Sequence, residues 1–222
     1  MSEDRYQDYV IKDGQLVGDF ESVYEKFEDP WHQSRVDHPL VTRRSIALVQ
    51  CMHLRGIDPT GQVNRVVEIG CGFGHLTDSL RQQGFSAVGT DVSATAVTKA
   101  REKNPSSVFM CASIDSPSYL SILDPDIVIM AEVTWYVLDQ LPRFLERLRE
   151  HAQNRERPTY LIHLLTTYPT GVQQYGKEYF TDLDGILNFF KLDYLESGFV
   201  QVNREDDPGS QGTYFIARVP RE

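Results

Sequence analysis

Three glycines spaced two residues apart follow an apolar run and an acid in the stretch VVEIGCGFGHLT. The acid is Glu68 and the glycines are Gly70, Gly72 and Gly74. Glycine adopts left-handed backbone conformations and lets other groups approach the chain closely, so this pattern predicts a tight turn between a strand and a helix. A ligand can lie against the backbone N–H groups of such a turn. A tight turn that binds no ligand can have the same glycines, so a second feature is needed to indicate a binding site.

That second feature is an acid at the end of the next apolar segment. Asp91 follows FSAVGT, 21 positions after Gly70. A carboxylate at the end of the second strand can accept hydrogen bonds from both hydroxyls of a ribose. Asp91 can also cap the helix expected after Ser93, and the two roles are compatible.

The turn departs from a dinucleotide-binding turn at one position. The pattern G-x-G-x-x-G requires a third glycine where this chain has His75. Glu68 suits a ligand with a positive centre and an amino-acid part, and it suits a pyrophosphate badly. The residues therefore disfavour a nicotinamide-dependent oxidoreductase, which stays as the less favoured alternative.

Short apolar strands alternate with amphipathic helices around these residues. This alternation predicts an α/β fold, with a mainly parallel sheet covered by helices on both faces. Expected strands cover residues 64–70, 85–91, 107–113, 126–132 and 159–167, and residues 194–203 and 212–220 form a closing antiparallel pair. Expected helices cover residues 20–27, 39–54, 74–84, 93–104, 138–148 and 183–190, and residues 206–212 form a hairpin turn.

Three segments in order, VVEIGCGFGHLT, VGTDVSATAVTKAREK and DIVIMAEVTWYV, resemble the class I S-adenosylmethionine-dependent methyltransferases. The resemblance covers about residues 60–165. It implies a Rossmann-like, seven-stranded sheet whose last strand is antiparallel. It also implies S-adenosyl-L-methionine as the methyl donor and S-adenosyl-L-homocysteine as the product.

The resemblance also implies a donor site. In many members an acid after the third strand binds the adenine amino group, whereas here Ser113 stands at that point, with Asp115 two residues on. After the fourth strand, the resemblance places Glu132 where the methionine end of the donor meets the acceptor; the alternative is a carboxylate satisfied by a helix N-terminus. The implied donor-site residues are Glu68, Gly70, Cys71 and Gly72, then Asp91 and Val92, then Ala112, Ser113 and Ile114, and finally Glu132.

A shorter fragment, FEDPWHQSR, and the segment AEVTWYV resemble the nodulation-type N-methyltransferases that act on chito-oligosaccharides. This likeness implies that the N-terminal segment folds over the donor. Trp31 and Arg35 would then lie near the donor carboxylate, with Arg44 a weaker candidate, although Trp31 can equally serve only packing. We expect residues 1–58 to form a helical cap and residues 59–222 a compact methyltransferase domain.

Candidate acceptor residues lie outside the donor half. His163, in the fifth strand, and His32, beside Trp31, are the candidate catalytic bases, and a core position is the alternative for His163. Tyrosines suit stacking on sugars or other flat polar groups, and a dimer contact would also explain the long loop that carries most of them. The candidate acceptor-binding tyrosines are Tyr136, Tyr168, Tyr175 and Tyr179.

The composition indicates which classes of partner and which compartment to expect. The 22 basic and 32 acidic side chains give a net charge of −10, which disfavours nucleic acid. The three scattered cysteines fit a reducing compartment, and with no apolar spanning run they predict a cytoplasmic protein. No metal-ligand or serine-nucleophile motif occurs, so no metal is expected.

These features predict a methyltransferase acting on a small molecule or a saccharide, by O- or N-methylation. Surface-glycan or specialised-metabolite biosynthesis is the expected setting, and a homodimer is compatible with the sequence. A non-catalytic module that binds S-adenosylmethionine is the second alternative.

Overall fold

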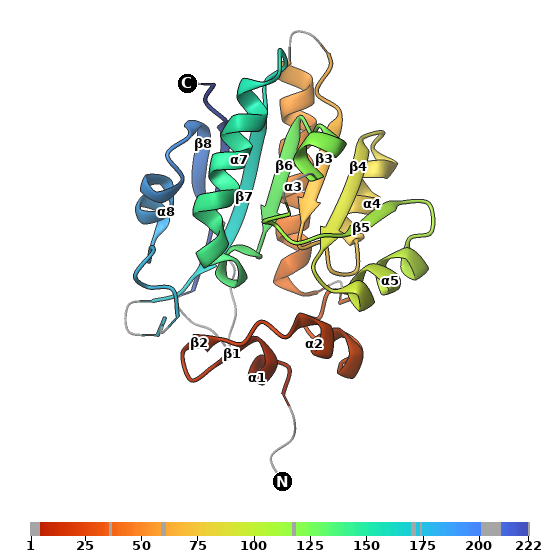
Figure 1. Cartoon of the computed structure of the whole chain (residues 1–222), viewed down its shortest axis with the longest axis vertical. Helices are drawn as coiled ribbons and strands as arrows, with labels where there is room; N and C mark the ends of the chain where they lie inside the picture. The colour runs from red at the N-terminus through yellow and green to blue at the C-terminus, as the bar shows by residue number, and fades with distance from the viewer. Residues whose placement is uncertain are drawn as a thin grey trace.

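A seven-stranded sheet forms the centre of the molecule (Figure 1). The computed structural model describes residues 5–35, 37–58, 61–116, 119–169, 172–173, 175–200 and 210–221. The strand order is β5-β4-β3-β6-β7-β9-β8, and β9 runs antiparallel to both of its neighbours, β7 and β8, as expected. The strands are β3 (Arg65–Ile69), β4 (Ser86–Asp91), β5 (Val108–Cys111), β6 (Ile127–Ala131), β7 (Tyr160–Thr167), β8 (Asp193–Val200) and β9 (Gln211–Arg218).

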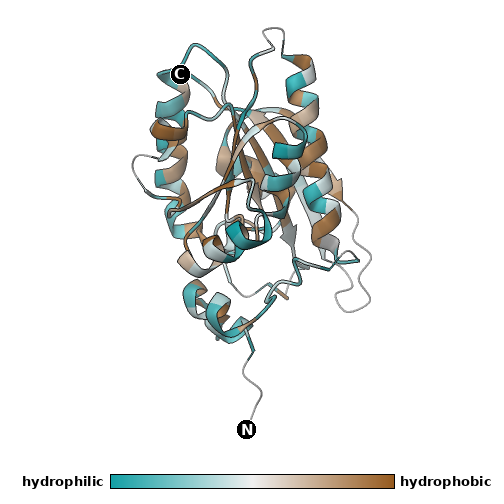
Figure 2. Ribbon diagram, turned by 90° about the vertical axis from the view of Figure 1, so that its right-hand side faces the viewer, coloured by the Kyte–Doolittle hydropathy of each residue, from teal (hydrophilic) through white to brown (hydrophobic). Residues whose placement is uncertain are grey.

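Helices cover both faces of this sheet, which lies between them in Figure 2. The helices are α3 (Pro39–Ile57), α4 (His75–Gln82), α5 (Ala94–Lys103), α6 (Tyr119–Leu123), α7 (Leu141–Gln153) and α8 (Leu183–Phe190). One face packs Ile127 and Ile129 against α3 and α4, and the other packs Val128 and Met130 against α7 and α8. Because both of its faces are buried, the central strand β6 is apolar throughout and does not alternate with polar residues.

The N-terminal segment lies across the carboxyl ends of the strands (Figure 1). It contains α1 (Gln7–Val10), the short ribbon β1 (Ile11–Lys12) and β2 (Gln15–Leu16), and α2 (Phe20–Lys26). The carboxylate of Glu21 fastens α2 to the start of α5, where it accepts from the hydroxyls of Ser93 at 2.7 Å and Thr95 at 2.6 Å. The segment therefore covers the end of the sheet at which parallel α/β folds bind ligands.

Several elements differ from the expectations. The helix expected over residues 39–54 runs on to Ile57, and α6 and the N-terminal ribbon were not expected. Residues 201–209, which include most of the expected hairpin turn, lie outside the described residues, and Gly212 already belongs to β9. Helix α3 shares a core cluster with the sheet through Ala47 and Leu54. The division of the chain at residue 58 stays a prediction. None of the described helices is long and apolar enough to cross a bilayer.

Candidate functional site

The glycine turn after β3 and the acid that ends β4, Asp91, form one site. Asp91 accepts the backbone N–H of Gly72 at 2.9 Å through Oδ2 and that of Ser93 at 3.0 Å through Oδ1. The helix cap is Ser93 rather than Asp91, because the Ser93 hydroxyl accepts the N–H of Ala96. Asp91 therefore joins the turn to the start of α5, and its remaining lone pairs can accept from a ligand.

Glycine is required at two points of the turn. Gly70 has a φ of 69°, and a Cβ there would lie 2.6 Å from Cγ2 of Val133. Gly72 has a φ of 52°, and a Cβ there would lie 2.4 Å from Oε1 of Gln33. The turn is thus pressed between the loop that follows β6 and the N-terminal segment.

Glu68 lies behind the turn and is buried. Its Oε2 accepts the hydroxyl of Thr77 on α4 at 2.5 Å. Burial raises the pKa of Glu68 to about 7, against the opposing effects of the Thr77 hydrogen bonds and the charge of Arg44. The protein therefore holds a carboxyl group near its ionisation point beside the expected cationic end of the ligand.

Gln33 contacts the turn directly and was not predicted from the sequence. Its Oε1 accepts the N–H of Phe73 at 3.0 Å, and its Nε2 donates to the Tyr24 hydroxyl at 3.1 Å. The guanidinium of Arg44 donates to the backbone carbonyl of Gln33 at 3.0 Å. A lone glutamine beside the DPW fragment carries no signal of such a role.

Trp31 reaches the site, and its indole N–H donates to the Tyr136 hydroxyl at 3.3 Å. Arg35 is exposed, and it pairs with Asp37 at 2.7 Å. Arg35 and Arg44 line a cleft of about 360 Å³ together with His75, at the start of α4. Arg44, the weaker candidate in the sequence, is the arginine that also hydrogen-bonds to the segment over the turn.

The predicted adenine edge lies beside Asp91. Ala112 donates its N–H to the Asp91 carbonyl at 2.9 Å, so β5 ends next to β4. Val92 is 53% exposed and offers an apolar surface there, whereas Ile114 is buried. The Ser113 hydroxyl donates to Asp115 at 2.6 Å, which links the serine to the acid two residues on.

The Glu132 carboxylate is bound by groups of β7 and α3 rather than by a helix N-terminus. Its Oε2 accepts the N–H of Thr166 at 3.2 Å and the Thr166 hydroxyl at 2.9 Å. Its Oε1 forms an ion pair with Arg43 of α3. In the sequence Arg43 is one of two adjacent arginines, and nothing in that pattern indicates that it pairs with Glu132.

The two candidate histidines differ in their surroundings. His163 is fully buried, stacked on Phe215 with ring centroids 4.7 Å apart, and its Nε2 lies 2.8 Å from the Thr134 hydroxyl. Burial lowers the pKa of His163 to about 3. This environment favours a packing role, because the ring is enclosed by aromatic side chains of the core. His32 is exposed on the N-terminal segment.

The four candidate acceptor-binding tyrosines differ in their contacts and exposure. Tyr136 lies under the N-terminal segment, with its ring 5.5 Å from that of Phe20, and Tyr168 is 38% exposed. Tyr175 packs partly buried against the core, and the Tyr179 hydroxyl donates to Asp139 at 2.5 Å, which raises the pKa of Tyr179 to about 12.

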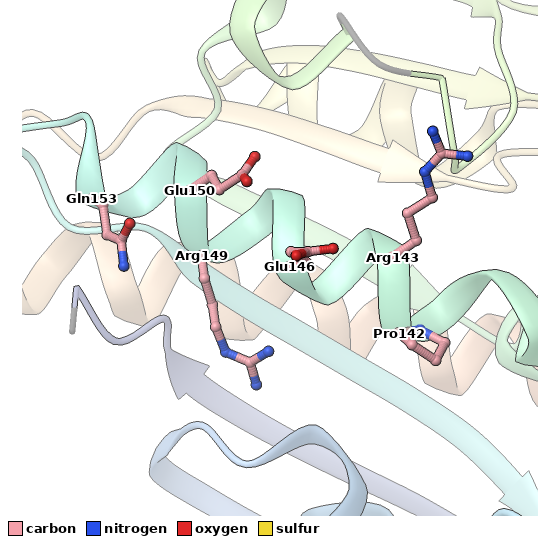
Figure 3. Close-up of a pocket in the computed structure, with 6 residues that line it drawn as sticks. All are labelled: Pro142, Arg143, Glu146, Arg149, Glu150 and Gln153. Carbon is pink, nitrogen blue, oxygen red and sulfur yellow. The ribbon is translucent and has the colours of Figure 1, made fainter.

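A separate hollow on the outer face of α7 contains none of the predicted site residues (Figure 3). Its side chains all project from that one helix. They are Pro142, Arg143, Glu146, Arg149, Glu150 and Gln153. The ligand site suggested by the sequence is therefore the glycine turn, not this hollow.

Comparisons with known proteins agree with the turn and the sheet. The protein-family model described as a methyltransferase domain matches residues 67–155 of the sequence. No curated protein matches the sequence. Among solved structures, the N-methyltransferase NodS from Bradyrhizobium japonicum WM9, in complex with S-adenosylhomocysteine, is similar with a TM-score of 0.62 at 18% identity. That match covers 90% of this chain and 98% of NodS.

Two other structures are similar over most of this chain. Magnesium protoporphyrin IX methyltransferase from Synechocystis PCC 6803, with bound S-adenosylmethionine, has a TM-score of 0.51 at 17% identity and covers 97% of this chain and 90% of its own. The kinase-methyltransferase WbdD has a TM-score of 0.59 at 18% identity and covers 79% of this chain and 40% of its own. At these identities the likeness is one of fold. The matched methyltransferase domain includes the glycine turn and its acid, Asp91, and the chain shares its fold with these S-adenosylmethionine-dependent methyltransferases.

Proposed function

We propose that the chain is an S-adenosylmethionine-dependent methyltransferase that acts on a small molecule or a saccharide, by O- or N-methylation. The observation that supports the donor site most directly is the hydrogen bond between Gly72 and Asp91, which joins the turn and the ribose acid. Val133 packs against Gly70. We infer that Glu132, the residue before it, lies beside the end of the donor that carries the methyl group.

The side chains present fit the donor. Asp91 keeps lone pairs for ribose hydroxyls next to Val92. We assign Glu68, which is buried behind the turn, to the cationic end. We assign the methionine part to Gly70, Cys71 and Gly72, the adenine edge to residues 112–114, and the donor carboxylate to the cleft of Arg35 and Arg44, near Trp31. When bound, the donor supplies a methyl group already activated on a sulfonium.

One side chain must adjust for the donor to bind. Gln33 fills the space beside Gly72 and accepts the Phe73 N–H, which is an N–H that a ligand at the turn would use. We infer that the Gln33 side chain turns away when the donor binds, while Trp31 and Tyr136 keep the N-terminal segment closed. A closed segment excludes water and holds donor and acceptor in line, which are the protein's main contributions to methyl transfer.

The acceptor assignment rests on the tyrosines and on the resemblance of the DPW fragment. Tyr136 and Tyr168 offer aromatic surface near the donor site, and His32 is the exposed candidate base. We place the enzyme in the cytoplasm, in surface-glycan or specialised-metabolite biosynthesis, without a nucleic-acid partner. A homodimer is compatible with this role.

The test is transfer of labelled methyl from S-adenosylmethionine to fractionated metabolites, glycan precursors, protein and RNA. Label in small molecules or saccharides is the expected result. Label confined to protein or RNA would contradict the proposal, and binding of the donor without any transfer would support a non-catalytic module.

A further inference from the structure

Glu132 breaks the alternation of β6 and turns toward α3. Val128 and Met130 face the side of the sheet that α7 covers, so a continued strand would place Glu132 on that side as well. Its φ is instead 61°, in the left-handed region, and its carboxylate meets Arg43 of α3 and Thr166 of β7. A residue other than glycine rarely adopts this conformation, and such positions cluster at functional sites.

Contacts with two residues fix the orientation of the Glu132 carboxylate. One oxygen accepts twice from Thr166, and the other pairs with Arg43, which also donates to the Thr166 hydroxyl. The side chain of Arg43 is 7% exposed and that of Glu132 is 19% exposed. The guanidinium is therefore desolvated, and its loss would leave a half-buried carboxylate without its counter-charge.

The position of Glu132 relates this pair to the reaction. It follows β6 directly, and the next residue, Val133, presses on Gly70 of the turn. In the proposed function, the methyl group and the acceptor meet at this edge. A carboxylate there accepts a hydrogen bond from an acceptor N–H or O–H, whereas an ionised phosphate oxygen has no hydrogen to donate to it.

We propose that Arg43 is a positioning residue that holds the Glu132 carboxylate, and that this carboxylate selects an acceptor whose methylated atom carries an N–H or O–H. The inference rests on the proposed function and excludes a phosphate oxygen as the acceptor atom. In the transfer, the acceptor lone pair forms the bond to the methyl carbon, and the carbon–sulfur electron pair returns to sulfur. The acceptor proton then leaves to solvent, so Glu132 orients the acceptor without having to keep its proton.

A double-mutant cycle tests whether Arg43 acts through Glu132. Arg43→Gln and Glu132→Gln should each lower kcat/KM for the acceptor about 10- to 100-fold, with the Kd for S-adenosylhomocysteine within about threefold. The double variant should lose no more than the worse single variant, and Arg43→Lys should regain at least half of the loss on a logarithmic scale. Additive losses, a parallel loss of donor binding, or no rescue by lysine would overturn the inference.

Arg155→Gln is the matched control. Arg155 is as buried as Arg43 and pairs with Asp126 at 2.5 Å, but at the opposite end of β6. This variant should lose stability and keep its kcat/KM. An equal loss of kcat/KM in Arg155→Gln would show that Arg43 matters only for folding.

The acceptor class is tested with glucosamine, glucose and glucose 1-phosphate, followed by a fractionated metabolite extract with labelled donor. Methylated amines or hydroxyls that depend on Glu132 are the expected products. A methyl phosphate ester as the main product would overturn this inference while leaving the proposed function intact. No transfer from wild-type protein to any fraction would remove the proposed function, and this inference with it.

Discussion

Asp91 accepts a hydrogen bond from the backbone N–H of Gly72 at 2.9 Å. The acid that ends β4 is therefore hydrogen-bonded directly to the turn that follows β3. The same carboxylate accepts the N–H of Ser93, just before α5. A change at Asp91 should therefore affect both the proposed ribose contact and the shape of the turn.

Gln33→Ala should strengthen donor binding. The variant removes the side chain that fills the space beside Gly72 and frees the Phe73 N–H. We expect the Kd for S-adenosylhomocysteine to fall by about 2- to 10-fold, equivalent to the net value of one hydrogen bond. Gln82→Ala, an exposed glutamine on α4, is the control for calorimetry. A Kd that rises tenfold in Gln33→Ala would mean that Gln33 holds the donor rather than yielding to it.

Glu68 should make stability depend on pH. Its pKa is about 7 in the folded protein and near 4.5 when unfolded, so between these values the folded state retains a proton that the unfolded state releases. Stability relative to Glu68→Gln, which cannot ionise, should therefore fall as pH rises from about 4.5 to 7 and stay level above that. The full change is about 3 kcal/mol.

Urea unfolding of wild type and Glu68→Gln at pH 5 and pH 8 measures this change. The variant should gain stability relative to wild type at the higher pH. Glu146→Gln, on the exposed face of α7, should show no such difference. An equal gap between wild type and Glu68→Gln at both pH values would contradict the assignment.

His163→Phe should keep activity while losing stability. The ring stacks on Phe215 and contacts the Thr134 hydroxyl from a fully buried position. Phenylalanine keeps the packing and leaves that hydroxyl without its partner, at a cost of about 1–3 kcal/mol. In a labelled-methyl assay, the turnover rate of the variant should stay within about threefold of the wild-type rate. A turnover rate reduced by two orders of magnitude or more, with the fold intact, would restore His163 as the catalytic base.

Trp31 should report donor binding by fluorescence. Trp135→Phe leaves Trp31 as the single tryptophan, in contact with Tyr136 above the site. Adding S-adenosylhomocysteine should shift its emission, because the ligand changes the contacts of the N-terminal segment. The same titration on Trp31→Phe, which keeps Trp135, should show a smaller change. An unchanged Trp31 signal at saturating ligand would place the segment away from the donor.

The sheet and the donor turn could be predicted from the sequence because both depend on local patterns. Apolar runs indicated the strands, and the spacing of Gly70 and Asp91 indicated the turn and its acid. Gln33 and Arg43 could not be predicted, because each contacts a residue far along the chain, Phe73 and Glu132 respectively. The sequence could not decide whether His163 is buried in the core, for the same reason. It does not show which aromatic rings pack around a strand residue, and here these are Phe190 and Phe215.

The central claim is that the glycine turn and Asp91 bind S-adenosylmethionine. Calorimetric titration of wild type and Asp91→Ala with S-adenosylhomocysteine, and separately with NADH, tests it most directly. We predict micromolar binding of S-adenosylhomocysteine alone, weakened at least tenfold by the substitution, which corresponds to about 1.4 kcal/mol or more. Binding of NADH instead, or S-adenosylhomocysteine binding that is indifferent to Asp91, would contradict the account.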